Sequence, residues 1–195
     1  SSVYGVLSKH NLLGYWNTPG APAEKEYQHK PTRIHEHWHV DLAYVKINGI
    51  FYFLAVLLDG YSRYILGWEL MTDMLSGSVE NFILSVREKY PDFNPKLITD
   101  NGSCFISRDF KRLVSSLGIQ QVFTRSHHPQ TNGKIERFNG TVRQEALRPD
   151  PPTSFQDACS TISDFVAYYN NHRLHAGIKY LRPADMFFGR DQQIL

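Results

Sequence analysis

The stretch HVDLAYVKINGIFYFLAVLLDGYSRYILGWEL, residues 39–70, decides the fold of this chain. Its first two segments, residues 39–47 and 50–58, are rich in β-branched and aromatic side chains, and they flank an Asn-Gly pair, which type I′ hairpin turns favour. An Asp-Gly pair then supplies a second turn before residues 63–70, a third strand-like segment. The stretch therefore predicts a three-stranded antiparallel meander.

Beyond this stretch, helical and strand-like patterns alternate. Apolar side chains recur at helical spacing over residues 79–90 and again over 107–117, and short apolar segments follow each at 96–99 and 119–123. A meander followed by two strand-helix units gives a mixed five-stranded sheet with two parallel strands and helices on both faces, because right-handed crossovers leave few topologies. The expected fold class is α/β with a ribonuclease H-like layout.

The last third of the chain combines a polar loop with two further helices. Residues 124–133 form a Pro- and Gly-containing loop, and a helix with one apolar face begins near Ile135. Ser154 can cap a final helix, with Asp157 as its reciprocal partner. The tail after Asn170 is expected to be irregular.

Composition excludes several classes of protein. The chain has 195 residues, of which 42% are hydrophobic and 21% charged, enough for one domain with a sizeable core. No apolar stretch reaches the roughly 18 residues of a membrane span, so we expect a soluble protein. The net charge of +2 means that any nucleic-acid surface must come from local clusters of Lys and Arg. The two cysteines have no metal-type spacing, which fits a reducing compartment.

The N-terminal residues differ in character from the rest. The chain begins in a pattern typical of the end of a helix, so we expect a fragment of a longer protein. Residues 17–33 carry three prolines and a glycine among polar residues and suit a linker. The compact domain is expected to begin near Ile34.

Three acidic residues suggest one metal site. Asp41 lies inside the first strand, expected in the middle of the sheet, and Asp100 ends the fourth strand, where ligands of such sheets gather. Thirty-five residues separate Asp100 from Glu136, which is expected on a helix. Each acid alone is more often a turn or capping group. Together they can hold two Mg²⁺ or Mn²⁺ ions about 4 Å apart for an in-line displacement at phosphorus.

Neighbouring polar residues leave alternatives open. His35, His37 and His39 alternate with Asp41, so in an extended strand they share a face that could hold Zn²⁺. The favoured interpretation is histidines that are partly solvated or pack beside the acids, because oxygen ligands suit phosphate chemistry better. Asp59 could be a fourth acid, although Asp-Gly at a strand end is usually turn chemistry.

Basic residues surround the proposed site. At about 100° per residue, Asn139, Gly140 and Arg143 share the side of the helix that carries Glu136. A solvated helix face is the ordinary alternative, but the cluster around the acids favours DNA contact. His127 and His128 either contact phosphate or order the loop. The residues expected to contact DNA are Arg125, Asn132, Lys134, Arg137, Asn139 and Arg143.

Residues 34–188 resemble the catalytic core of the DDE transposase and retroviral-type integrase family, and are most similar to bacterial insertion-sequence transposases. The spacing between the last two acids and the residues around them carry this resemblance. The similar motifs are WHVD (residues 38–41), DGYSR (59–63), TDNG (99–102), HPQTNGKIERF (128–138) and YNNHR (169–173).

The resemblance implies a function. It makes Asp41, Asp100 and Glu136 the catalytic and metal-binding triad, with water or a DNA 3′-hydroxyl as nucleophile and no covalent protein intermediate. The partners would be element ends and target DNA, with a homo-oligomer as the active assembly, no membrane, and action at the nucleoid in the bacterial cytoplasm. Residues 1–33 would be the end of an upstream DNA-binding region and a linker, and 189–195 a tail. The alternatives are a structure-specific nuclease of the same fold and an inactive DNA-binding module.

Overall fold

The structure is a computed structural model, which describes residues 30–124 and 133–194. The chain divides into two units, Ser1–Lys30 and Pro31–Leu195, and nearly all of the first lies outside the described residues. The expected upstream region therefore falls outside them, as does most of the loop predicted for 124–133, including Arg125, Asn132 and the two histidines between them. Among the described helices, none has the length and apolar character of a membrane span.

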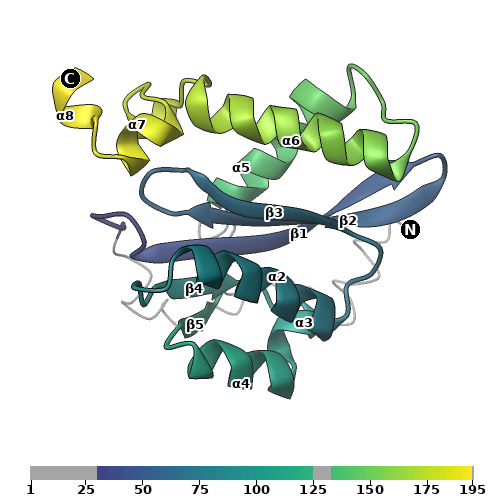
Figure 1. The fold of residues 1–195 in the computed structure, drawn as a ribbon, viewed down its shortest axis with the longest axis horizontal. Coiled ribbons are helices and arrows are strands. Elements are labelled where there is room, and N and C mark those ends of the chain that lie inside the picture. Colours follow the sequence, from purple (N-terminus) through teal and green to yellow (C-terminus); the bar gives the residue numbers. More distant parts are fainter. Residues whose placement is uncertain (1–29, 125–132, 195) are drawn as a thin grey trace, which may run out of the picture. The chain divides into compact units, whose positions relative to one another are not determined.

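A five-stranded sheet in the order β3-β2-β1-β4-β5 organises the second unit (Figure 1). The first three strands pair antiparallel, whereas β4 is parallel to both β1 and β5. The predicted mixed sheet is confirmed, with β1 in its middle. The strands are β1 (His37–Ile47), β2 (Ile50–Asp59), β3 (Ile65–Met71), β4 (Lys96–Thr99) and β5 (Gln120–Phe123).

The turn between β1 and β2 is the one that the sequence predicts. Asn48 and Gly49 have positive φ angles of 47° and 86°, as a type I′ turn requires at both central positions. The register pairs Ile47 with Ile50 and continues without a shift along the hairpin. Asn48 and Gly49 adopt a left-handed backbone and so fix the register of the hairpin. The register in turn decides which side chains of β1 face each side of the sheet.

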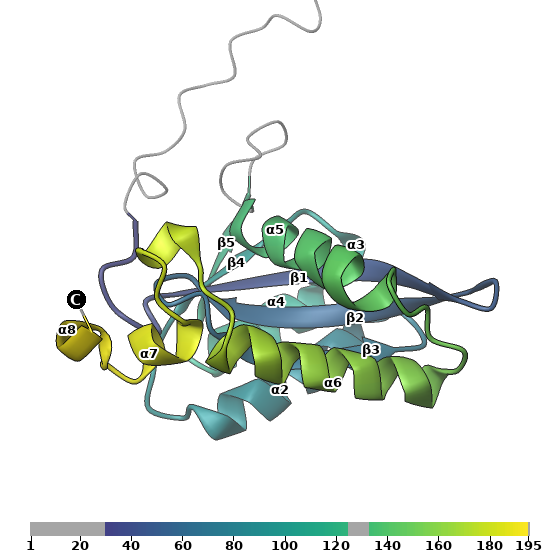
Figure 2. The same ribbon diagram turned by 90° about the horizontal axis from the view of Figure 1, so that it is seen from above.

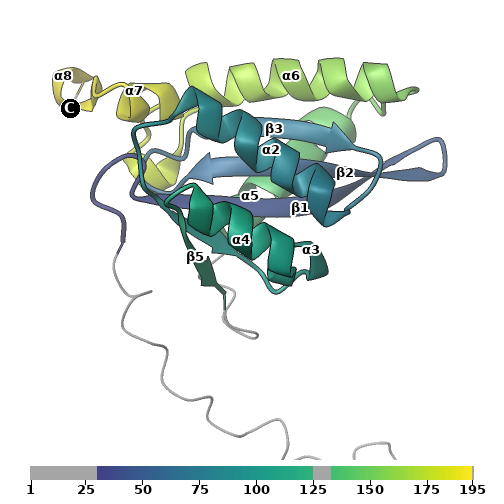
Figure 3. The ribbon, with the colours of Figure 1, turned by 60° about the horizontal axis from the view of Figure 1, so that its bottom comes forward.

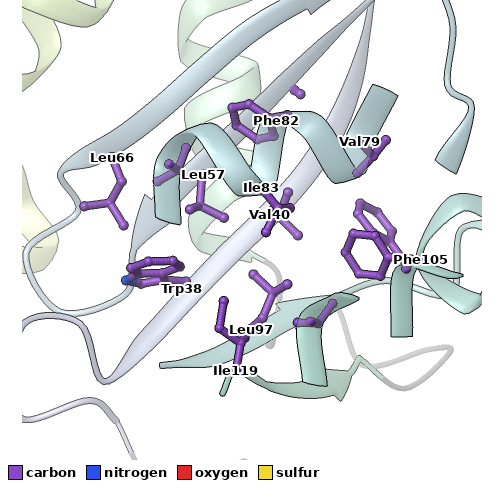
Figure 4. Packing of buried hydrophobic residues seen from close by; sticks show 14 of the residues in the cluster. Trp38, Val40, Leu57, Leu66, Val79, Phe82, Ile83, Leu97, Phe105 and Ile119 are labelled. Carbon is purple, nitrogen blue, oxygen red and sulfur yellow. The ribbon is translucent and has the colours of Figure 1, made fainter. Parts of the chain in front are cut away.

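Helices cover both faces of this sheet, as Figures 1 and 3 show. On one face lie α2 (Ser76–Lys89), α3 (Ser103–Ile106) and α4 (Arg108–Ser116). The cluster on this face joins Trp38 and Val40 of β1 to Phe82 and Ile83 of α2 (Figure 4). Leu97 of β4 is fully buried in the same cluster, so the parallel part of the sheet is fixed to the meander by apolar packing.

The opposite face is covered by α5 (Gly133–Val142) and α6 (Phe155–Asn171), seen from above in Figure 2. Ile135 and Phe138 of α5 pack with Val45 of β1 and Ile162 of α6. Side chains alternate along a strand, so the odd-numbered residues of β1 face α5 and the even-numbered ones face α2. Asp41 consequently lies on the α5 side.

Serine caps begin two helices. Ser107 Oγ accepts a hydrogen bond from the Phe110 N–H at 3.1 Å, and Ser154 Oγ accepts one from the Asp157 N–H at the same distance. The predicted cap of α6 is therefore confirmed. Its reciprocal bond differs, because the Asp157 carboxylate accepts from the N–H of Thr153, at 2.8 Å, instead of that of Ser154.

The prediction of an irregular tail after Asn170 is wrong. The chain continues through η4 (Ala176–Ile178), α7 (Pro183–Phe187) and α8 (Asp191–Ile194). Proline suits the first turn of α7, and Phe187 at its end packs against Tyr64 with ring centroids 4.4 Å apart. Helices of three to five residues are too short to produce a repeating apolar pattern, which also explains why α3 was not predicted. The helix expected to begin near Ile135 does continue past Val142, but its last five residues form the π-helix η3 (Arg143–Leu147).

Candidate active site

The parallel register between β1 and β4 brings two of the three acids together. It pairs Trp38 with Leu97 and His39 with Ile98, and two further residues along each strand bring Asp41 alongside Asp100. Asp100 directly follows β4 at its carboxyl end, and β1 is the central strand. Residues 59 positions apart in sequence thus become neighbours through strand pairing alone.

Helix α5 brings the third acid to the same side of the sheet. Its apolar side chains Ile135 and Phe138 are buried against the sheet and α6, and Glu136 lies between them on the exposed side. The negative charge of Glu136 acts on Asp41, as does that of Asp100. The three carboxyl groups therefore interact across β1, β4 and α5.

Asp41 is the most perturbed of the three. Burial, followed by the charge of Asp100 and more weakly that of Glu136, raises the pKa of Asp41 from 3.8 to about 6. The Leu42 N–H and the side chain of Asn139 oppose this rise because they donate hydrogen bonds to the ionised form. A buried carboxylate beside two like charges is an arrangement that a cation stabilises.

Asn139 is a direct partner of Asp41. Its Nδ2 donates to Asp41 Oδ2 at 2.8 Å, its side chain is 7% exposed, and its buried Oδ1 has no partner within the described part of the chain. This position differs from the DNA contact expected for Asn139. The residue lies one helical turn after Glu136, so a single helix both supplies one acid and holds another.

Residues around Asp100 fix the end of β4. The Gly102 N–H donates to Asp100 Oδ1 at 2.9 Å, which forms a turn around that carboxylate. Asn101 Nδ2 donates to the Thr124 carbonyl at 3.0 Å and ties this turn to the residue after β5. In the Thr-Asp-Asn-Gly motif, Asp100 is therefore the candidate catalytic residue, and Asn101 and Gly102 shape the loop around it.

The three carboxylates lie near one another, but their side chains are not arranged to coordinate one ion. Across residues 30–124 and 133–194, no three His, Cys, Asp or Glu side chains are placed to share an ion. Asp41 and Asp100 each accept a hydrogen bond from a protein group, while Glu136 is exposed. In donor chemistry, three carboxylates fit Mg²⁺ or Mn²⁺.

A zinc site at the three histidines is not formed. His35 has a positive φ of 58° and precedes β1, so it does not follow the alternation of the strand. Its ring stacks on Phe93 with centroids 3.9 Å apart, and its Nδ1 accepts from the Trp38 indole N–H at 3.1 Å. His35 thus joins the aromatic cluster around Trp38, while His37 and His39 belong to the face of Asp41.

Asp59 is a structural residue of the turn after β2. One carboxylate oxygen accepts from the His35 N–H at 2.7 Å, and the other accepts from both the N–H and the hydroxyl of Ser62. The side chain is fully buried. These bonds support the turn interpretation of Asp59 over that of a fourth acid.

Gly60 lies at a crowded junction beside His37 and His39. A side chain at this position would begin 2.9 Å from His39 Nε2 and 3.1 Å from His37 Cβ, so only glycine fits. The Gly60 carbonyl accepts from Arg63 Nη1 at 2.6 Å and from Lys134 Nζ at 3.0 Å. This single carbonyl connects the β2–β3 turn to the helix that carries Glu136.

Comparison with known families identifies the family of this chain. A family model described as "Integrase core domain" matches residues 31–129, and a second model with the same description matches residues 117–183. The first match alone covers more than half of the chain. The chain belongs to the integrase core domain family.

Relatives of this integrase core domain include insertion-sequence proteins. The transposase for insertion sequence element IS904 from Lactococcus lactis subsp. lactis (strain IL1403) is 27% identical over 158 residues, which cover 80% of this chain and 62% of that protein. The integrase core domain chain spans about three fifths of the length of the first relatives it matches.

Solved structures share its fold. A chain of the simian T-cell lymphotropic virus intasome, solved with PP2A regulatory subunit B56 gamma, is 17% identical, with a TM-score of 0.71 over 82% of this chain and 56% of that one. The HTLV-2 integrase catalytic core domain, solved with magnesium in a trimeric form, is 18% identical, with a TM-score of 0.64 over 80% and 98%. The ribonuclease H-like layout is thereby confirmed for the integrase core domain.

Some residues that meet one another in the structure were not singled out from the sequence. Arg63 and Tyr169 belong to motifs that carried the family resemblance, and His175 follows the second motif by two residues, but no role was predicted for them. Arg63 is far from Tyr169 and His175 along the chain, so the sequence does not reveal that they lie near one another. The sequence did show Arg and His next to aromatic residues in two separate segments. That pattern alone does not indicate that the two segments lie side by side in the fold.

Proposed function

We propose that this chain is the catalytic core of a DNA transposase, a polynucleotidyl transferase that hydrolyses phosphodiesters at element ends and joins the freed 3′-hydroxyl to target DNA. The observation that carries this proposal is the effect of Asp100 and Glu136 on the half-buried Asp41, through which three carboxylates from distant segments act on one another. Membership of the integrase core domain family and the insertion-sequence relatives support it.

Asp41, Asp100 and Glu136 are the residues that would hold Mg²⁺ or Mn²⁺, most simply as two ions. Bound there, the cations would activate the attacking oxygen and neutralise the leaving one. Asp41 is half-buried and held by Asn139, so it offers a fixed ligand, whereas the exposed Glu136 can change its side-chain rotamer to complete the site. Although the pKa of Asp41 is raised to about 6, its carboxyl is still mostly ionised at neutral pH.

DNA would lie along the exposed side of α5, where Lys134, Arg137 and Arg143 flank Glu136. Arg125 and Asn132 are proposed to contribute from the preceding loop, and Asn139 to act through Asp41. We further propose that several copies of the protein act together at the nucleoid in the cytoplasm, and that residues 1–33 belong to an upstream DNA-binding region and linker.

The test compares Asp41→Asn, Asp100→Asn and Glu136→Gln with wild type. Each amide keeps the shape of its side chain and loses its charge, so the domain should stay folded by circular dichroism while activity falls at least 100-fold. Activity is measured in Mg²⁺ or Mn²⁺ as nicking of a supercoiled plasmid and as attachment of a labelled oligonucleotide with a free 3′-hydroxyl to that plasmid. Glu88→Gln, an exposed change on α2, is the matched control.

The outcomes separate the candidate functions. Joined oligonucleotide that disappears in all three amide variants supports a transferase. Nicking without joining would identify a nuclease, and metal-dependent turnover near the wild-type rate in any one variant would remove that residue from the triad. Wild-type protein that binds DNA but neither cuts nor joins it would indicate a binding module.

A further inference from the structure

A cluster of cations and polar aromatic groups lies on the side of the sheet where the acids are found. Arg63 follows β2, and its guanidinium reaches the Gly60 carbonyl, beside which lies the ring of His39. His39 precedes Asp41 by two residues, or roughly 7 Å along a strand. The cluster therefore adjoins the candidate active site without sharing its acids.

The segment after α6 supplies the other half of this cluster. A side chain built at Gly177 would begin 3.9 Å from Arg63 Nε and 3.3 Å from two ring atoms of His175, so Arg63 and His175 border the same space. The Tyr169 and His175 rings lie with centroids 6.3 Å apart, and the Arg173 guanidinium lies 5.9 Å from the Tyr169 ring centroid.

Positive charge in this cluster exceeds the negative charge placed against it. Arg173 is paired with Glu145 through a two-point contact at 2.8 and 3.1 Å, and the charge of Asp59 acts on Arg63. Arg137 lies one turn of α5 after Lys134, whose Nζ shares the Gly60 carbonyl with Arg63, and among the described ion pairs Arg137 has no carboxylate. Burial first, and then the charges of Arg63, Arg173 and Arg137, lower the pKa of His175 to about 4. Like charges gathered beside a buried aromatic group are stabilised when an anion binds.

His175 is oriented as a donor in this setting. Its Nδ1 accepts from the Gly177 N–H at 3.1 Å, so the proton of the neutral ring is assigned to Nε2. Arg63 is held in place by an unusual backbone, with φ of 68°, and by the bond from Nη1 to Gly60. A fixed guanidinium and a neutral N–H donor around one space suit a phosphate oxyanion.

We propose that Arg63, Arg137 and His175 form a phosphate-binding subsite that holds a backbone phosphate of the bound DNA, separate from the phosphate that reacts at the acids. The inference rests on the proposed function for its ligand. It assigns a role to the Tyr-Asn-Asn-His-Arg segment, which places Tyr169 and Arg173 around the subsite and leads into His175. The subsite needs no metal ion, because its donors are cations and a neutral imidazole.

The experiment measures DNA binding against salt concentration. The probe is a fluorescent 30-base-pair duplex in KCl with EDTA, and the variants are Arg63→Gln, Arg137→Gln and the double variant. Arg112→Gln is the matched control, because Arg112 carries the same charge on α4, across the sheet, and its side chain is 80% exposed. Arg137 is exposed on α5, so its variant tests the subsite even if Arg63→Gln disturbs the turn.

Each single variant should weaken binding at all sequences and lower the salt slope by up to about 0.9, the value for one phosphate contact. If both arginines contact the same phosphate, the double variant should lose about one such contact, and the two effects should be non-additive. Arg112→Gln should match wild type. A slope for Arg137→Gln equal to that of wild type, or fully additive losses of about 1.8 in the double variant, would overturn the shared subsite.

The result is independent of catalysis. If the variants show the predicted changes in slope but the wild-type protein neither cuts nor joins DNA in Mg²⁺, the proposed function is contradicted while the phosphate site is supported. If the wild-type protein cuts and joins DNA but the slopes of both single variants equal that of wild type, the proposed function is supported and the phosphate site is overturned.

Discussion

Asp41 carries an electrostatic cost that its own fold imposes. Its pKa is raised from 3.8 to about 6, so the folded protein binds this proton more tightly than the unfolded chain does. The contribution of Asp41 to stability is therefore fully present below about pH 4 and is lost as pH rises through about 6. Ionised Asp41 thus destabilises the metal-free domain at neutral pH.

Asp41→Asn should consequently stabilise the metal-free protein at pH 7. The expected gain in the free energy of unfolding is on the order of 2 kcal/mol, and it should vanish near pH 4, where the carboxyl is already neutral. Urea unfolding in EDTA at both pH values measures it, with the exposed Asp109→Asn on α4 as control. A gain that is the same at pH 4 and pH 7 would show that charge is not its cause.

Replacing Asn139 tests whether the residue that positions Asp41 affects activity. Asn139→Ala removes the donor to Asp41 Oδ2 and should lower metal affinity or turnover by about 10- to 100-fold, as loss of a group that orients a metal ligand does. The measurement is the initial joining rate against Mg²⁺ concentration. Asn81→Ala, an exposed change on α2, should have no effect. An unchanged Mg²⁺ dependence in Asn139→Ala would remove it from this role.

At the scale of elements, a side chain connects α6 to the edge of the sheet. Asn170 Oδ1 accepts from the Ile65 N–H at 2.9 Å, and its Nδ2 donates to the Ile65 carbonyl at 3.2 Å. This pair of bonds imitates a strand neighbour on the outer side of β3, where the register with β2 also shifts. Asn170 thereby positions the end of α6, and the segment that follows this end supplies His175 to the proposed phosphate subsite.

Asn170→Ala should therefore destabilise the domain by about 2 to 4 kcal/mol, because it leaves both polar groups of buried Ile65 without a partner. Asn171→Ala is the matched control, since exposed Asn171 bonds only to a carbonyl of its own helix. Chemical denaturation of both variants measures the difference. If the two asparagines cost the same, the contact between α6 and β3 contributes little.

At the scale of the whole molecule, metal and folding are linked. Clustered carboxylates repel one another without a cation, and an ion that binds the native state alone stabilises it. Mg²⁺ or Mn²⁺ at ten times its dissociation constant should add about 1.4 kcal/mol and raise the melting temperature by roughly 3 to 6 °C. The rise should shrink in Asp100→Asn, whereas an equal rise in that variant would place the ion elsewhere.

The sequence by itself determined the sheet, and it singled out three acids whose charges the structure brings to act on one another. The Asn-Gly hairpin, the alternating strands and the two strand-helix units leave few ways to connect five strands, and the structure adopts the predicted one with β1 central. Such signals are local, because turn backbone and apolar periodicity are properties of consecutive residues. The caps at Ser107 and Ser154 were accessible for the same reason, since Ser154 lies three residues from its donor.

Only the tertiary structure decided which distant side chains meet. The position of Asn139 against Asp41, of Arg63 against His175 and of His35 among aromatic rings depends on how helices dock on the sheet. Helical spacing placed Asn139 on the side of Glu136, yet it could not tell a buried amide from an exposed one. Hydrogen bonds and charges between residues far apart in the chain leave no periodic trace in the sequence, because packing selects them after the elements have formed.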